Sequence, residues 1–295
     1  MRNYILRLSC YFLIYLRRIR NIRAKRRLGI NLTKTHDLVD KLQRTHNEVC
    51  HIIASGSSVL DTIPIINSKD TIIGFNFSAL IPIKFDLYLI ESASHKYIGP
   101  ANLKGHDFPE LTTKSQSLLI NSLKKNNPEC VVILKNILSP MININEIHNQ
   151  EHLYIDIFLD ELNICGLGNF YENNKLLCLR EMLFGKYDFI LQSETSVLTA
   201  INIAVRTGFK KIIIHGMDGG GSHFYNTQEF VNNIITNENK RTLDLLLSGM
   251  TESDYSSAVA AGSAAKDYMH QVEKILSSKG IKLNYAKDII NNPHE

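Results

Sequence analysis

Short runs of apolar residues alternate with segments of helical spacing from residue 49 onward. Segments 57–66, 113–125, 197–207 and 258–278 have helical spacing. Unbroken apolar runs bounded by glycine, proline or asparagine are typical of strands buried on both faces. Because strands and helices alternate, we expect an α/β fold with a doubly wound parallel sheet. The predicted strands are Val49–Ala54, Thr71–Phe75, Leu87–Ile90, Val131–Leu134, Lys211–His215 and Ile281–Tyr285.

Two of these strands end in small and polar residues. Ser55-Gly56-Ser57-Ser58 follows the first strand, and His215-Gly216-Met217-Asp218 ends the fifth, just before three more glycines. In α/β proteins, ligands bind where polar side chains and bare backbone meet at the carboxyl ends of strands. We therefore expect the two strand ends to converge and to hold a nucleotide.

Other polar residues stand at element ends. Small residues at 55–58 let backbone N–H groups approach a phosphate or ribose, although a Ser/Gly-rich turn alone is a weak signal. Asn76, after the second strand, either contacts the edge of a base or forms an Asx turn. Thr195 and Ser196 either cap the following helix or contact a phosphate or ribose.

Two histidines are candidates for acid–base chemistry. His223 follows Gly221-Ser222 in a predicted loop, where an imidazole reaches a substrate and acts as general base near neutral pH. His215 alternates with apolar neighbours at a strand end. It is therefore either catalytic or a hydrogen-bonded histidine of the core.

Several classes of chemistry lack their sequence motifs. The chain has neither GxxxxGK[ST] nor GxGxxG, no Asp-x-Asp pair, no HExxH and no Gly-x-Ser-x-Gly. Its five cysteines form no CxxC pair, so we expect neither a zinc site nor a disulfide framework but a reducing cytosol. We expect no metal and no cofactor.

Residues 1–28 form a distinct basic segment. Residues 1–27 contain nine arginines and lysines and no acid, so the rest of the chain has a net charge of +4 − 9 = −5. The apolar run after Arg7 is too short for a bilayer span, which needs about 20 residues. The segment is expected to be an amphipathic helix on an anionic membrane surface, or else a helix packed on the protein body. Its recurring apolar residues are Ile5, Leu8, Phe12, Tyr15, Ile19 and Ile22.

The remaining chain divides into a connector at 29–48 and one catalytic domain at 49–290. Residues 139–180 are rich in asparagine and aromatic residues and are interpreted as a lid or acceptor-binding insertion, or as ordinary variable surface. Basic residues are not spread over a working face, so nucleic acid is not an expected partner. The oligomeric state stays open, a homo-oligomer included.

Four segments, in order, resemble the bacterial sialyltransferases of glycosyltransferase family 42. The resemblance covers roughly residues 50–92 and 190–286. It implies a Rossmann-like domain, a GT-A-like variant with a lid, and transfer of a sialyl residue from CMP-sialic acid with inversion and without a metal. The four segments are HIIASGSSVLD, IIGFNFS, TSVLTAINIAVRTGFKKIIIHGMD and KILSSKGIKLNYA.

The resemblance also implies roles for residues of this chain. It implies that Ser55–Ser58 and Asn76 contact CMP, that Thr195 and Ser196 lie by the cytidine or ribose, and that Gly216 and Asp218 lie at the strand end. In the family a tyrosine in the following loop supports the leaving phosphate, and Tyr225 is the nearest candidate for it in this chain. Two positions depart from the family. Glu91 stands where the family has an asparagine, and Gly262-Ser263 where it has its general-base histidine, which leaves His223 as the candidate base.

These features together predict a sialyltransferase-like enzyme. Its substrates would be a CMP-activated nonulosonic acid and a cell-surface glycan or glycolipid, as in lipopolysaccharide or O-antigen biosynthesis. It would lie on the inner face of the bacterial inner membrane. Two alternatives are a transferase for another nucleotide sugar and a non-catalytic glycan-biosynthesis binding protein on the same fold.

Overall fold

The computed structural model describes the strands and helices that surround the two expected strand ends. The described residues are 48–90, 119–134, 152–153, 157–158, 175–185, 190–191, 196–218, 223–228 and 269–291, with single residues 8, 12, 15, 16, 19, 230 and 240.

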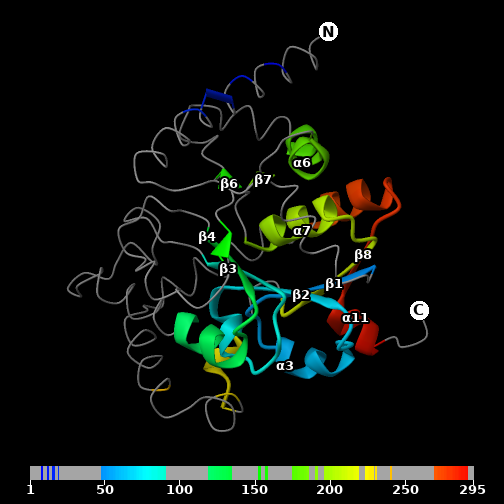
Figure 1. Cartoon of the computed structure of the whole chain (residues 1–295). Helices are drawn as coiled ribbons and strands as arrows, with labels where there is room; N and C mark the ends of the chain where they lie inside the picture. The colour runs from blue at the N-terminus through cyan, green and yellow to red at the C-terminus, as the bar shows by residue number, and fades with distance from the viewer. Residues whose placement is uncertain are drawn as a thin grey trace, which may run out of the picture.

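Seven parallel strands form the central sheet, in the order β5-β4-β3-β2-β1-β8-β9 (Figure 1). Each of the six predicted strands is confirmed, and four have the predicted bounds. A separate pair joins β6 (Ile157–Phe158) to β7 (Ile190–Leu191). The strands of the central sheet are β1 (Val49–Ile53), β2 (Thr71–Phe75), β3 (Leu87–Ile90), β4 (Val131–Leu134), β5 (His152–Leu153), β8 (Lys211–His215) and β9 (Lys282–Tyr285).

The strand order reverses between β1 and β8. From β1 the strands proceed outward through β2, β3 and β4 to β5, whereas β8 and β9 lie on the other side of β1. This is the doubly wound arrangement that the sequence predicts, and its reversal point is where such sheets bind ligands. Ile53 of β1 lies level with His215 of β8, so the two expected strand ends are neighbours.

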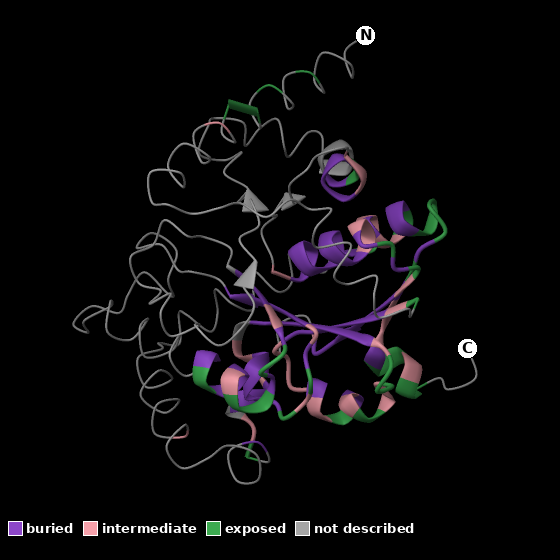
Figure 2. Cartoon of the chain, viewed as in Figure 1, coloured by how far each residue is buried: buried purple, intermediate pink, exposed green. Residues whose placement is uncertain are grey.

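Side chains of the strands enter two cores, one on each face of the sheet. Cys50 and Ile52 pack in the core that contains residues of α6 (Lys175–Phe184), α7 (Ser196–Arg206) and the helix at 269–277. Ile53 packs in the other core, with α3 (Val59–Thr62) and the helix at 119–126. β2 and β3 are buried along their whole length, β1 and β8 are buried after their first residue, and helices lie above and below the sheet (Figure 2). Burial on both faces accounts for the apolar runs of these strands.

Several elements are not anticipated by the sequence, β6 and β7 among them. α6 packs on α7 rather than directly on the sheet, and α11 (Ala286–Asn291) follows β9 without a turn. β5 lies within the segment interpreted as a lid and adds the edge strand to the central sheet. A lid formed by the rest of residues 139–180 stays a prediction, and of the connector at 29–48 only Glu48 is described.

Candidate functional site

Backbone hydrogen bonds join the ends of β1 and β8 beyond the sheet itself. Ala54 N–H donates to the His215 carbonyl at 2.9 Å, and Gly56 N–H donates to the Gly216 carbonyl at 2.7 Å. Strand pairing thus continues to the turn at 54–58, at the reversal point of the sheet. The turn and the residues after β8 therefore form one structural unit, as the sequence predicts.

This close approach depends on two glycines. A Cβ on Gly56 would lie 2.5 Å from Asp218 Oδ2 and still nearer to the Gly216 carbonyl oxygen. Gly216 has a φ of +66°, a backbone conformation that residues other than glycine rarely adopt. Only glycine lets the two backbones come so close, which explains the Gly-x-Asp and Ser-Gly-Ser patterns at these positions.

Asp218 fixes the turn through its carboxylate. Oδ2 accepts hydrogen bonds from the Ser58 backbone N–H at 2.9 Å and from the Ser57 hydroxyl at 3.3 Å, and Oδ1 accepts one from the Ser58 hydroxyl. The hydroxyls of Ser57 and Ser58, two residues predicted to contact the nucleotide, thus bind this carboxylate, and their contact with a nucleotide stays a prediction. A carboxylate has about four acceptor positions, so Asp218 has room for one further donor.

His223 lies against the same turn. It forms an isolated antiparallel bridge with Gly56, and the next residue, Phe224, donates its N–H to the Ser55 carbonyl at 2.9 Å. The His223 ring lies nearly parallel to that of Tyr225, with ring centroids 4.9 Å apart. Two segments about 170 residues apart in the chain are thereby held together at the strand ends.

The contacts of His223 define which ring nitrogen carries the proton. Nδ1 lies 3.3 Å from the Ser55 carbonyl oxygen and 3.1 Å from the Ser55 hydroxyl. A carbonyl oxygen only accepts, so this contact favours the tautomer with the hydrogen on Nδ1, in which Nε2 keeps its lone pair. Burial lowers the pKa of this half-buried imidazole, although the bond to Ser55 opposes the shift. His223 is therefore neutral at neutral pH and suited to accept a proton.

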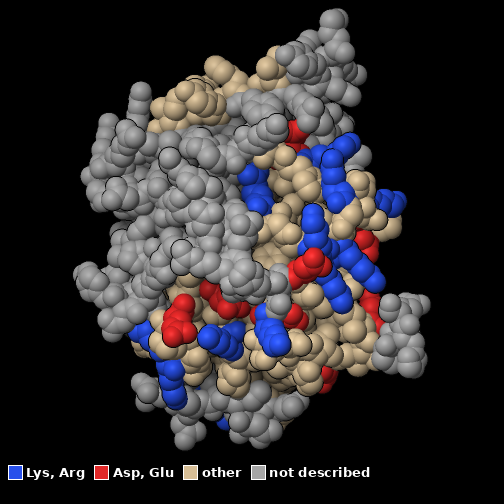
Figure 3. Space-filling model, turned by 45° about the vertical axis from the view of Figure 1, so that its right-hand side comes forward, with Lys and Arg blue, Asp and Glu red and all other residues tan. Residues whose placement is uncertain are grey.

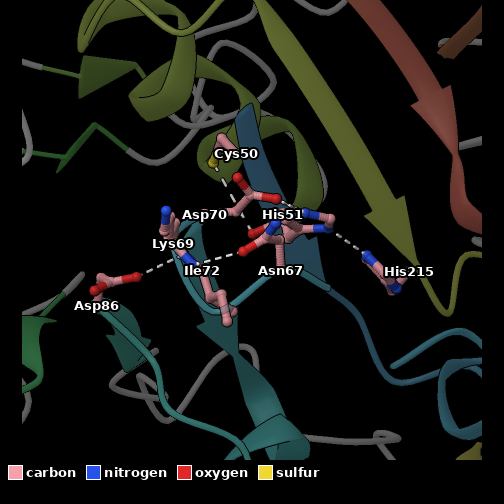
Figure 4. A network of polar contacts seen from close by, with 8 residues as sticks. All are labelled: Cys50, His51, Asn67, Lys69, Asp70, Ile72, Asp86 and His215. Atoms are coloured by element: carbon pink, nitrogen blue, oxygen red, sulfur yellow. Dashed lines mark hydrogen bonds and ion pairs between the residues drawn. The ribbon is translucent and has the colours of Figure 1, made fainter. Parts of the chain in front are cut away.

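His215 occupies a different environment from the one expected for a catalytic residue. Its side chain is fully buried beneath the strand end, with Nε2 2.8 Å from His51 Nδ1 and Nδ1 3.0 Å from Thr62 Oγ1. His51 Nε2 lies 3.0 Å from Asp70 Oδ2 (Figure 4). The structure thus supports the second alternative of the sequence analysis, a hydrogen-bonded core histidine.

A single direction of donation satisfies this buried chain with neutral rings. His51 donates to the Asp70 carboxylate and His215 donates to His51, which leaves His215 Nδ1 to accept from the Thr62 hydroxyl, whose single hydrogen is shared with the Val59 carbonyl at 3.0 Å. Burial, reinforced by the neighbouring His51, lowers the pKa of His215 to about 3. Burial lowers the pKa of His51 as well, although Asp70 acts in the opposite direction. The network joins α3, β1, β8 and the residue before β2 directly below the candidate site.

We expect the free energy of unfolding to fall in acid because of His215. Below pH 6.5 the unfolded chain protonates this histidine, whereas the folded protein does not until about pH 3. Between those values one such histidine lowers the free energy of unfolding by about 1.4 kcal/mol per pH unit. Urea titrations across this range measure the slope.

Two substitutions separate the buried histidine from ordinary surface ones. The His215→Gln variant should show a shallower acid slope, because glutamine does not titrate. The matched His270→Gln variant alters an exposed histidine and should keep the wild-type slope. An equal slope in all three proteins would mean that His215 does not govern the acid sensitivity.

The structure describes only part of the surroundings of the other residues expected at the site. Ser196 is the first residue of α7, and because α7 runs antiparallel to β8 its start lies at the carboxyl edge of the sheet. Asn76 begins the 3-10 helix Asn76–Leu80 after β2, but its side chain lies outside the described residues. Glu91 and Thr195 lie outside them altogether. Their roles stay predictions.

Sequence reasoning missed the His51–His215 pair. His51 lies at the centre of β1, and His215 ends β8 directly after three isoleucines. Once these strands are paired, the register places both side chains on the α3 face, because His51 lies level with Ile213. The two histidines in these strands could be seen in the sequence. Their pairing could be inferred only once β1 and β8 were known to be neighbours.

No protein-family profile and no curated protein matches this chain. Among solved structures, the monofunctional α-2,3-sialyltransferase Cst-I from Campylobacter jejuni is 14% identical, with 69% of this chain and 73% of that one covered and a TM-score of 0.33. The sialyltransferase CST-II in complex with a trisaccharide acceptor and CMP is 15% identical, with 70% and 78% covered and a TM-score of 0.31. These proteins belong to the family that the sequence motifs resemble.

Proposed function

We propose that this protein is an inverting, metal-independent glycosyltransferase that moves sialic acid or a related nonulosonic acid from its CMP donor to a glycan acceptor. The observation that supports this most is the neutral imidazole of His223, held at the reversal point of the sheet with Nε2 available as a base. Within the described part of the chain, Nε2 has no hydrogen-bond partner. The proposed function rests on this site and on the order of the four sequence motifs.

In this proposal the donor nucleotide lies between the turn at 54–58 and Asp218. Asp218 accepts a ribose hydroxyl at its remaining acceptor position, as acidic residues do in other dinucleotide-binding folds. The phosphate lies on the Ser55 side, away from the carboxylate, because two anions repel each other. The backbone N–H groups of Ser55 and Ser57 donate to no described residue and are suited to bind phosphate oxygens.

The proposed transfer needs one base and a stabilised leaving group. His223 Nε2 takes the proton of the acceptor hydroxyl while that oxygen forms a bond to the anomeric carbon from the face opposite CMP. The bond between the anomeric carbon and the phosphate oxygen breaks, and its electron pair leaves with CMP. Tyr225 and the glycine run Gly219–Gly221 are proposed to stabilise the departing phosphate. The anomeric configuration is inverted.

We expect the protein to release CMP from CMP-sialic acid when a surface-glycan acceptor is present. The purified chain would be incubated with a panel of CMP-, UDP- and GDP-sugars, with and without EDTA, and released nucleotide would be measured. Release of CMP alone, unaffected by EDTA, is the expected result. The His223→Gln variant is the control for contaminating enzymes.

Other results of the same panel would contradict the proposal. Release of UDP or GDP would assign the site to a different nucleotide sugar. CMP binding without any turnover would favour a non-catalytic binding protein, the alternative suggested by Gly262-Ser263 at the family's histidine position.

A further inference from the structure

Large apolar side chains are exposed mainly near the amino-terminal end. Among the described residues, five large hydrophobic side chains are exposed, and four of them lie between residues 8 and 16. Leu8, Phe12, Tyr15 and Leu16 are 52%, 62%, 60% and 46% exposed. Figure 2 shows most of the described residues of this segment as exposed, well away from the central sheet, and only Ile19 is intermediate. Exposed apolar residues this concentrated mark an interaction surface.

These four residues share one side of a helix. Residues 8, 12, 15, 16 and 19 are all helical. Their spacings of 4, 3, 1 and 3 residues keep them within one apolar stripe, because an α-helix turns by about 100° per residue. We call Leu8, Phe12, Tyr15 and Leu16 the amino-terminal stripe.

The charge around the stripe differs from that of the rest of the chain. Residues 1–27 contain nine basic residues and no acidic one, whereas the remainder has a net charge of −5. On the face drawn in Figure 3, basic and acidic side chains are mixed over the described surface. The charged residues around the stripe are all basic. A matching partner therefore has an apolar region that the stripe can enter and negative charges that the arginines can contact.

We propose that the amino-terminal stripe docks on the surface of an anionic lipid bilayer. Apolar side chains would enter the acyl boundary while arginines contact the headgroups. A second copy of this chain is a poor partner, because two segments that each carry nine positive charges repel each other. The apolar run between Arg7 and Arg17 is far shorter than the ~20 residues of a bilayer span, so the helix lies on the membrane. This inference is independent of the proposed function.

Vesicle flotation of the full-length protein tests the inference. We expect it to float with vesicles of phosphatidylcholine and phosphatidylglycerol and not with phosphatidylcholine alone. The double variant Phe12→Ser/Leu16→Ser should bind the anionic vesicles at least about tenfold more weakly, because binding scales with the apolar area that enters the membrane. High salt should weaken binding by the wild type.

The matched control is Ile290→Ser on α11. Ile290 is 42% exposed and lies outside the basic segment, so its loss should leave vesicle binding unchanged. The inference would be overturned if Ile290→Ser lost as much vesicle binding as the double variant, or if the double variant lost none. Binding of the wild type to neutral vesicles would also overturn it. A dimer that sediments without vesicles and dissociates in the double variant would assign the stripe to a second copy. Urea unfolding, measured in parallel, shows whether each variant remains folded and keeps this test separate from the proposed function.

Discussion

Sugar transfer by the His223→Ala variant is expected to fall by about 10²- to 10⁴-fold, the usual contribution of a general base. CMP binding should remain, because the turn at 54–58 is held by Asp218 and by the Gly56–Gly216 bond, which this substitution leaves intact. Initial rates with saturating CMP-sialic acid measure the first quantity, and calorimetric titration with CMP measures the second.

The pH profile separates a base from a merely structural residue. Activity should fall in acid as His223 becomes protonated, and because burial lowers its pKa, the midpoint of the acid limb should lie below the ordinary histidine pKa. The His270→Ala variant, which alters an exposed histidine, should keep wild-type activity. Unchanged turnover in His223→Ala, or a loss of CMP binding equal to the loss of rate, would remove His223 as the base.

The Gly56→Ala variant is expected to lose measurable CMP binding. Its new Cβ would overlap the Gly216 carbonyl and the Asp218 carboxylate, so the ends of β1 and β8 must separate. Overpacking of this kind costs about 1–3 kcal/mol in the free energy of unfolding, which a domain of ordinary stability tolerates. Urea unfolding and CMP calorimetry on the same preparation measure both effects.

Gly280→Ala provides the matched control. Gly280 also has a positive φ, +71°, but a Cβ there would meet no atom within 4 Å. The variant should lose about 1 kcal/mol in the free energy of unfolding from backbone strain and should bind CMP normally. If Gly56→Ala binds CMP as well as Gly280→Ala does, the close approach of the strand ends is not what forms the site.

Most of the main strands were predictable because they are buried on both faces and therefore read as apolar runs. β9 is the exception, since only one of its four residues is buried. β5, with two residues, is too short to give such a signal. α6 has no strong apolar stripe, since it packs on α7 in a second layer rather than on the sheet. The doubly wound order followed from strand–helix alternation and from the positions of the two Gly-containing strand ends.

The sequence predicted where the candidate site lies but not which hydrogen bonds its residues form. The sequence indicated that residues 55–58, Gly216, Asp218 and His223 belong together. It did not show that the hydroxyls of Ser57 and Ser58 bind Asp218, because such contacts depend on how two distant turns meet. Likewise, the strand-end position of His215 was compatible with either role until its pairing with His51 was known.

The central claim is that the ends of β1 and β8 enclose a cytidine nucleotide. A crystal structure of the protein with CMP bound tests it most directly. We predict nucleotide density between residues 54–58 and 216–218, with a ribose hydroxyl on Asp218 and the phosphate nearer Ser55. Density for CMP at any other place, or crystals grown at saturating CMP whose strand ends hold none, would contradict the account.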